Sequence, residues 1–275
     1  MENISTLSGS DCLIALSRLY GGKWDPICHD IRERKTKDLS AHLPTDEDLK
    51  GWTPITILDL ERYPQKLRDA VAKPPFVLYA KGNVGHLAAA DEALLVISPR
   101  SYSHYSAAYA MMRVARDEKI PAVILWNDPD PEMANNGYAL EALRAYQWSK
   151  VPFVVVVPPS CRDPEALANE VASTGGLAIM EAFPGSEARM DPIASRIGAG
   201  LAKAALVLGG GASPSGASMA VGFALSAGLD VGALAWPAFS ENGKLCHELI
   251  RDGALCVSEP QDLLTLLGKG DDEKA

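Results

Sequence analysis

The sequence has 275 residues, 47% of them hydrophobic and 22% charged, which predicts one sizeable globular core with room for a small additional domain. The 26 Lys and Arg residues against 35 Asp and Glu residues give a formal net charge of −9. The bulk charge therefore does not indicate nucleic-acid binding, and any anion site must be a local basic patch.

The five cysteines are an odd number without C-x-x-C spacing, which argues against a disulfide framework and against a zinc cluster. We expect no metal site, and we also expect no cofactor. The N-terminal residues lack the basic and apolar regions of a signal peptide, and no apolar run approaches the roughly 18 residues of a membrane span. The sequence thus predicts a cytoplasmic protein without a membrane partner.

Residues 1–54 predict a small helical module. A periodic apolar segment covers residues 11–20, with Ser10 or Asp11 as a possible N-cap and the pair Gly21-Gly22 as its stop. A second capped start lies at residues 44–49. Basic residues between the two segments alternate with acids, which is more typical of a solvated helix face than of a nucleic-acid contact. These residues are Arg32, Arg34, Lys35 and Lys37.

Residues 55–268 show short apolar runs that alternate with helical segments. This pattern predicts an α/β fold with a doubly wound, mostly parallel, Rossmann-like sheet that is covered on both faces. We expect residues 269–275 to form a disordered tail. The expected strands are 76–79, 93–97, 122–126, 153–157, 176–179, 204–208, 231–235 and 255–257, and the expected helices are 102–118, 136–147, 163–173, 191–202, 215–227, 244–252 and 260–267.

Ligands of such sheets bind outside the carboxyl ends of the strands. This rule selects four loops, namely 98–100, 127–130, 158–162 and 209–216. The last of them has the most distinctive sequence, because an apolar run stops in three glycines and then restarts as a helix of small residues. We refer to residues 209–216 as the glycine loop.

The glycine loop has the composition of an anion site. Gly209, Gly210 and Gly211 allow positive φ and a close approach of a ligand to the backbone. Ser213, Ser215 and Ser218 can cap the following helix, whose free N–H groups favour an anion such as a phosphate. The loop matches neither G-x-x-x-x-G-K-[ST] nor G-x-G-x-x-G. An ordinary strand-to-helix turn is therefore the alternative interpretation.

Several motifs resemble the DNA processing protein A family (DprA, also called Smf). The segment LERYPQKL at residues 60–67, followed by PPFVLY at residues 74–79, is similar to the YPxxL and PPxLYxxG signature of that family. In the C-terminal half, Ser215-Gly216, the AWP sequence at residues 235–237 and CHELIRDGA at residues 246–254 follow the order of its SGSLITA, VFAVPG and GCHxLIR.GA motifs. The resemblance covers residues 60–257.

The central segments depart from the family pattern. The family sequence GSR is replaced by Ser98-Pro99-Arg100, and SGxAxGID is replaced by WNDPD at residues 126–130. Residues 191–203 retain a single arginine, Arg196, where the family has FPxRNRIIAGLS. These changes remove glycines, hydroxyls and basic side chains from positions that carry the family pattern.

The resemblance implies a non-catalytic protein that binds single-stranded DNA, forms homodimers and loads a RecA-type recombinase in DNA processing, natural transformation or recombination. Basic side chains and backbone amides at the strand ends would contact the phosphates without reading the base sequence. Lys244, His247 and Arg251 would lie near the rim. The candidate site residues are Arg100, Arg196, Lys203, Gly209, Gly210, Gly211, Ser213, Ser215 and Gly216.

Individual residues have alternative interpretations. Arg100 either contacts the ligand or forms an ion pair with Asp128 or Asp130, and Arg196 either contacts a phosphate or forms a structural ion pair. His247 is more typical of a packed or capping residue than of a ligand contact. Adjacent helical residues point in different directions, so Cys246 and His247 cannot form a catalytic dyad.

Two other functions are compatible with the motifs. The pocket could bind a free nucleotide or a nucleotide-derived signal, a ligand that needs fewer cations than DNA. Alternatively, LGGG at residues 208–211 is similar to the PGGxGTxxE motif of lysine-decarboxylase-like enzymes that cleave nucleoside monophosphates at the N-glycosidic bond. The glutamate of that motif is missing here, which argues against the enzyme.

Overall fold

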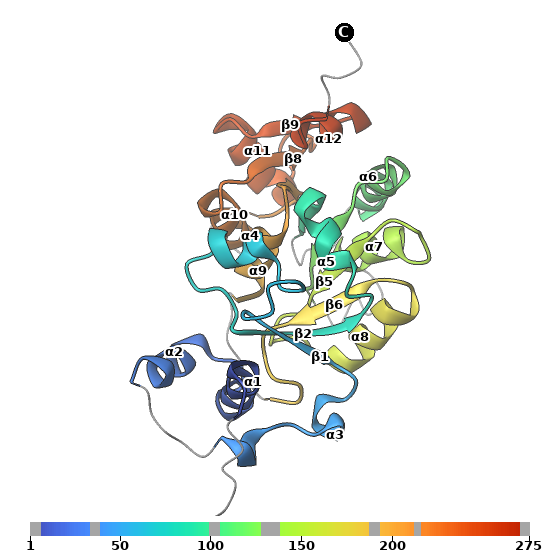
Figure 1. The fold of residues 1–275 in the computed structure, drawn as a ribbon. Helices are drawn as coiled ribbons and strands as arrows, with labels where there is room; N and C mark the ends of the chain where they lie inside the picture. Colours follow the sequence, from blue (N-terminus) through green and yellow to red (C-terminus); the bar gives the residue numbers. More distant parts are fainter. Residues whose placement is uncertain are drawn as a thin grey trace, which may run out of the picture.

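A central sheet of nine strands organises the computed structural model, which describes residues 7–33, 39–98, 105–127, 138–186, 193–211 and 216–269 (Figure 1). The strand order is β1-β2-β6-β5-β4-β3-β7-β8-β9. Strand β2 runs antiparallel to both neighbours, and the pairs from β6 to β9 are parallel. The strands are β1 (Thr53–Thr56), β2 (Val77–Gly82), β3 (Leu94–Ile97), β4 (Ala122–Leu125), β5 (Phe153–Val156), β6 (Leu177–Met180), β7 (Ala204–Val207), β8 (Asp230–Leu234) and β9 (Leu255–Val257).

The α/β prediction is confirmed, and each expected strand is present with its limits shifted by at most a few residues. Strand β1 was not expected. The helices are α1 (Gly9–Tyr20), α2 (Trp24–Arg32), α3 (Asp46–Leu49), α4 (Gln65–Ala70), α5 (His86–Ala89), α6 (Tyr105–Asp117), α7 (Tyr138–Tyr146), α8 (Pro164–Ser173), α9 (Ile193–Leu201), α10 (Gly216–Ser226), α11 (Lys244–Arg251) and α12 (Pro260–Leu266), with short 3-10 turns at Ser40–His42, Ala90–Glu92 and Glu241–Gly243. None of these described helices is long and apolar enough to cross a membrane.

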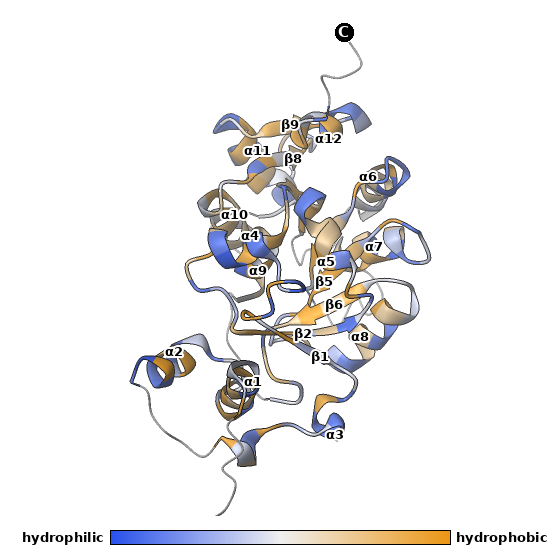
Figure 2. Cartoon of the chain, viewed as in Figure 1, coloured by the Kyte–Doolittle hydropathy of each residue, from blue (hydrophilic) through white to orange (hydrophobic). Residues whose placement is uncertain are grey.

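Two helical layers cover the sheet because successive strand residues face opposite sides. In β3, Leu94 and Val96 belong to one core cluster, and Leu95 and Ile97 belong to the other. Helices α6, α7, α8 and α12 contribute to the first cluster, whereas α4, α5, α9, α10 and α11 contribute to the second (Figure 1). Figure 2 shows β5 and β6 as hydrophobic segments inside this arrangement.

The order of the strands reverses between β3 and β7. Strands β3, β4, β5 and β6 follow one another toward one edge, and the chain then returns through α9 to place β7 on the other side of β3. Beyond the paired residues, the N–H of Leu208 donates to the carbonyl of Ile97 at 2.9 Å. A doubly wound sheet opens a crevice at the carboxyl side of such a topological switch point.

The N-terminal residues form helices, as predicted. Helix α1 begins after the N-cap Ser8, which forms a capping box with Asp11, so the expected N-cap at Ser10 or Asp11 is wrong. The stop at Gly21 is confirmed, because this residue adopts a left-handed conformation with φ of 61°. Thr45 caps α3 in the same manner. Of the basic cluster, Arg32 closes α2, and Arg34, Lys35 and Lys37 lie outside the described residues.

The N-terminal helices pack directly on the sheet. The hydroxyl of Tyr79 lies 2.9 Å from the Ser17 hydroxyl, and the Trp24 ring stacks on Phe76 with 5.4 Å between centroids. A Cβ atom at Gly22 would collide with the carbonyl of Glu181, so glycine is required where the module meets the end of β6. Strand β1 begins two residues before the expected boundary at residue 55.

Candidate functional site

Three segments end together at the switch point between β3 and β7. Ser98 directly follows β3, Gly209 lies two residues beyond β7, and Asn127 lies two residues beyond the neighbouring strand β4. The side-chain amide of Asn127 donates to the carbonyl of Ser98 at 3.0 Å. This bond holds the segment after β4 next to the segment after β3. This is the place where the sheet topology predicts a ligand.

The Ser98 hydroxyl is the distinctive group at this place. Ser98 is 3% exposed, and its Oγ makes no hydrogen bond with any described residue. Ser186 is the other described residue with a buried, unpartnered hydroxyl. Burying a hydroxyl without a partner is unfavourable, so such a group at a ligand-binding position is available to the ligand. Ser98 was not among the predicted site residues, although it is the first residue of a selected loop.

The glycine loop follows β7 after Leu208, as predicted, and Gly210 packs against helix α11. Gly209, Gly210 and Gly211 are absent from the described residues with positive φ, so that expectation is wrong. A Cβ atom at Gly210 would lie 2.8 Å from Leu245 Cδ2. The N–H of Gly210 donates to the Asn242 carbonyl at 2.7 Å. The absence of a side chain at Gly210 therefore allows helix α11 to pack against the loop. The N–H of Gly210 already donates a hydrogen bond within the protein.

Trp236 and helix α11 close the other side of the glycine loop. The indole N–H of Trp236 donates to the Leu208 carbonyl at 3.1 Å, and Nε2 of His247 lies 3.1 Å from the Trp236 carbonyl, so the ring holds its proton on Nε2 in this bond. His247 is thus packed, as one interpretation held. Burial raises the pKa of the Cys246 thiol to about 12, so this cysteine is not a thiolate nucleophile at neutral pH.

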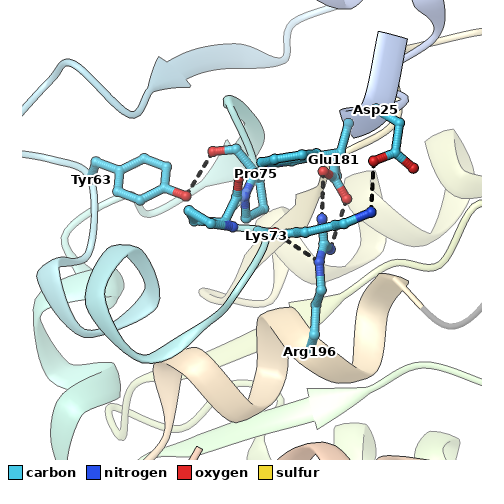
Figure 3. A network of polar contacts seen from close by, with 8 residues as sticks. Asp25, Tyr63, Lys73, Pro75, Glu181 and Arg196 are labelled. Carbon is cyan, nitrogen blue, oxygen red and sulfur yellow. Dashed lines mark hydrogen bonds and ion pairs between the residues drawn. The ribbon is translucent and has the colours of Figure 1, made fainter. Parts of the chain in front are cut away.

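Arg196 forms a structural ion pair (Figure 3). Its Nη1 and Nη2 atoms donate to the Glu181 carboxylate at 2.9 and 2.8 Å, and its Nε donates to the Lys73 carbonyl at 2.9 Å. Both charged side chains are buried. Glu181 directly follows β6, which is four strand spacings, about 19 Å, from β7. The structure therefore does not bring Arg196 to the glycine loop.

Lys203 lies at the opposite edge of the sheet. It directly precedes β7, whereas Gly209 lies beyond the end of this strand, roughly 20 Å further along an extended chain. Its Nζ is 3.2 Å from Oε2 of Glu92, and its N–H donates to the Ala93 carbonyl at 2.9 Å. Lys203 is thus separated from the switch point, because residues that precede a strand lie at its amino end.

The other predicted residues divide into two groups. Gly216 is the first residue of α10, so the N-terminus of this helix follows the glycine loop as expected. Arg100, Ser213 and Ser215 lie outside the described residues, and their contacts stay predictions. Asp128 and Asp130, the alternative partners of Arg100, and the tail from residue 270 also lie outside them.

Comparison with known proteins matches the C-terminal part of the chain, which carries the glycine loop. Residues 156–268 match the family model described as DNA recombination-mediator protein A. Over these residues the chain is similar to the DNA processing protein A family. The family resemblance predicted from the motifs is thereby confirmed. Comparison with curated proteins finds no match.

Two solved DprA structures share the fold. DprA from Streptococcus pneumoniae has 22% sequence identity and a TM-score of 0.67, with 95% of this chain and 94% of that chain covered. DprA from Helicobacter pylori, a structure that describes a single-stranded DNA binding mode, has 17% identity and a TM-score of 0.59, with 79% of this chain and 96% of that chain covered. The doubly wound architecture is thus the fold of these DprA structures.

Proposed function

We propose that this DprA-family protein binds single-stranded DNA through backbone phosphates at the switch point and acts in DNA processing without catalysing a reaction. One observation carries the proposal: the buried Ser98 hydroxyl has no partner among the described residues, at the strand end where this fold admits a ligand. The family match supports DNA as the ligand.

Three kinds of group would hold a phosphate here. The hydroxyl of Ser98 can donate one hydrogen bond, and the first N–H groups of α10 carry the partial positive charge of a helix N-terminus. Arg100, which the sequence places two residues after Ser98, supplies the full positive charge. None of these groups reads a base, so binding is independent of sequence.

The small number of cations sets the expected salt dependence. Arg196 and Lys203 are engaged with Glu181 and Glu92, away from the switch point, so they do not add to the phosphate site. Neutralising one or two phosphates of a single strand gives a slope of log affinity against log salt of about −1. The site therefore binds DNA with a weaker salt dependence than a groove lined with many basic side chains.

The proposal extends to a homodimer that passes the bound strand to a RecA-type recombinase in the cytoplasm, during natural transformation or recombination. These parts rest on the family resemblance. Size-exclusion chromatography with light scattering tests the dimer, and co-sedimentation of the DNA-bound protein with a bacterial recombinase tests the partner. A monomer at all concentrations, or no co-sedimentation, would contradict the respective part.

Fluorescence anisotropy of labelled oligo-dT at two salt concentrations tests the central proposal. A panel of mononucleotides and cyclic dinucleotides serves as competitor. We expect micromolar or tighter oligo-dT binding that weakens with salt. Saturable binding of a nucleotide without binding of oligo-dT would replace DNA with a free nucleotide as the ligand. Release of free base from a nucleoside monophosphate would contradict the non-catalytic role.

The substitution Arg100→Ala tests whether Arg100 contacts the DNA, unlike Arg196 and Lys203, which lie away from the switch point. We expect weaker oligo-dT binding, by about tenfold, because a charge-assisted hydrogen bond to phosphate is lost. Lys203→Ala is the matched control, since it removes a basic residue at the amino edge of the sheet. Equal affinities of the two variants would exclude Arg100 from the site.

A further inference from the structure

The side chain of Asn127 joins β3 and β4 beyond their last paired residues. Pairing between these two parallel strands ends with Val96 beside Ile124. Further along, Nδ2 of Asn127 donates to the Ser98 carbonyl at 3.0 Å. A side chain thus joins the two segments after the paired part of the strands has ended.

This hydrogen bond fixes the orientation of the Asn127 side chain. A carbonyl oxygen only accepts hydrogen bonds, so the side-chain nitrogen of Asn127, and not its side-chain oxygen, must face Ser98. The Asn127 side chain makes this one hydrogen bond with the described residues. Asn127 is half-buried and belongs to neither hydrophobic cluster. Holding Ser98 is therefore the contribution of this side chain that the structure shows.

Ser98 is a polar residue in an apolar row. Leu94 and Val96 belong to the cluster that contains α6 and α7, so the alternation along the strand points Ser98 to the same side. Continuing the register places Leu208 and Trp126 beside it, and both belong to that cluster. The Ser98 Oγ makes no hydrogen bond with any described residue. The position of the hydroxyl is thus set by the backbone of residue 98 and not by a partner of its own.

Two hydrogen bonds hold the peptide groups on either side of the Ser98 Cα atom. From β7, the N–H of Leu208 donates to the Ile97 carbonyl at 2.9 Å, which fixes the peptide before this atom. From β4, Asn127 donates to the Ser98 carbonyl, which fixes the peptide after it. The two peptide planes together set the direction of the Ser98 side chain. A group that binds a ligand must be held to within about 0.5 Å, so this restraint bears directly on binding.

The segment that carries Asn127 departs from the family sequence. WNDPD at residues 126–130 stands where the DprA family has SGxAxGID. No defined position of that motif has a side-chain amide. The hydrogen bond that holds Ser98 is therefore not part of the family pattern, and it comes from residues that this chain has in its place.

We propose that Asn127 is a positioning residue of the DNA site, which holds Ser98 so that its hydroxyl meets a backbone phosphate. The inference rests on the proposed function. Without the Asn127 amide, the peptide after Ser98 loses its hydrogen bond, and the hydroxyl spreads over more than one direction. DNA then binds more weakly, although no group that touches the phosphate has been removed. Direct contact of Asn127 with the DNA is the competing explanation, and the test separates the two.

A double-mutant cycle with Ser98 tests the inference in the full-length protein. Affinity for labelled oligo-dT is measured by anisotropy for the wild type, Asn127→Ala, Ser98→Ala and the double variant. We expect Asn127→Ala to weaken binding by about fivefold, the value of one hydrogen bond. In the Ser98→Ala background, the same change should weaken binding by less than about twofold, because the hydroxyl that Asn127 positions is already missing.

Asn83→Ala is the matched control. Nδ2 of Asn83 lies 3.0 Å from Nε2 of His86, and its Oδ1 accepts from the Gly85 N–H at 3.2 Å. Asn83 follows β2 beside the amino end of β6, so its loss should leave oligo-dT affinity unchanged. Asn127→Leu is a second variant that keeps the branched shape and lacks the N–H donor, and it should give the same cycle. Urea unfolding identifies the variants that are folded.

The salt dependence separates positioning of Ser98 from positioning of Arg100, which follows two residues later. Asn127→Ala removes no charge, so the slope of log affinity against log salt should stay at the wild-type value of about −1. Loss of a phosphate-binding cation, as expected for Arg100→Ala, makes this slope smaller. A smaller slope for Asn127→Ala would overturn the assignment to Ser98.

Two further results would overturn the inference and leave the proposed function standing. Unchanged oligo-dT affinity of Asn127→Ala and Asn127→Leu, while the wild type binds, would show that the hydrogen bond is not required. Equal losses of about fivefold in the wild-type and Ser98→Ala backgrounds would show that Asn127 contacts the DNA by itself. Failure of the wild type to bind oligo-dT would overturn both the proposed function and the positioning role of Asn127.

Discussion

Two strand ends at the carboxyl edge of the sheet differ in how their polar groups are satisfied. At the end of β6, the Glu181 carboxylate is held by Arg196, which also donates to the Lys73 carbonyl, and Lys73 pairs with Asp25 at 2.6 Å (Figure 3). At the end of β3, the Ser98 hydroxyl is buried without a partner among the described residues. The charged groups at the end of β6 are therefore paired within the protein, whereas the Ser98 hydroxyl at the end of β3 is available to a ligand.

The sheet topology explains the difference. The N-terminal module packs on the end of β6, where Gly22 contacts Glu181 and the hydroxyl of Tyr63 donates to the Pro75 carbonyl at 2.8 Å nearby. Between β3 and β7 the connecting helices leave on opposite faces of the sheet, since α6 follows β3 and α10 follows β7. In doubly wound sheets, ligands bind where the connecting helices separate in this way.

The largest expected effect is on folding, from Arg196→Met. This change leaves Glu181 as an unpaired buried charge, and removal of one partner of a buried ion pair costs about 3–5 kcal/mol. The free energy of unfolding is measured in urea. Arg62→Met is the control, because Arg62 forms an exposed pair with Asp59 and should cost no more than about 1 kcal/mol. Equal losses in the two variants would contradict the structural role of Arg196.

The same variant should show a defined pH dependence. Burial raises the pKa of Glu181 above 4.5, and the hydrogen bonds and charge of Arg196 oppose that rise. Without Arg196 the pKa in the folded state rises further, so the folded state binds more protons than the unfolded state above pH 4.5. The free energy of unfolding of Arg196→Met should therefore increase as the pH falls from 7 toward 4.5. The difference in unfolding free energy between this variant and the wild type should become smaller over the same range. A constant gap would contradict this explanation.

The next effect tests the packing function of the glycine loop. In Gly210→Ala the new methyl would lie 2.8 Å from Leu245 Cδ2, and overpacking of this kind costs about 1–3 kcal/mol. Gly211→Ala is the matched control, since no atom lies within 4 Å of the position that its new methyl would take. Urea unfolding should separate the two variants. A fully stable Gly210→Ala variant would show that the contact with α11 is not required.

Removal of the two buried hydroxyls should have a smaller effect, which we expect on DNA affinity and not on stability. Ser98→Ala and Ser186→Ala each remove an unpartnered hydroxyl, so neither should reduce stability. Only Ser98→Ala should weaken oligo-dT binding, by about tenfold, because a hydrogen bond to a charged phosphate is lost. Anisotropy titration measures both variants. Equal affinities would remove Ser98 from the proposed site.

The fold could be predicted from the sequence because its strands are short, apolar and buried on both faces. Strands such as Phe153–Val156 consist of hydrophobic residues alone. Strand β1 escaped prediction because Thr53-Pro54-Ile55-Thr56 is not a continuous apolar run and Pro54 is tolerated only at an edge. The short helices α4 and α5 were missed because they span one or two turns.

The position of the candidate site could be predicted from the strand pattern, but the contacts of the residues assigned to it could not. The packing of Gly210 depends on its contact with Leu245, which lies far away in the sequence. The position of the Arg196 side chain depends on its ion pair with Glu181, which lies on another element. Lys203 is a different case, because strand direction alone places a residue that precedes β7 at the amino edge.

Hydrogen exchange measured by mass spectrometry with and without oligo-dT tests the central comparison most directly. If the strand binds at the switch point, amide exchange should slow in residues 204–211 and in the first turn of α10, while residues 177–186 and α9 stay unchanged. Protection at the Glu181–Arg196 end alone, or no protection in either region at saturating DNA, would contradict a binding site between β3 and β7.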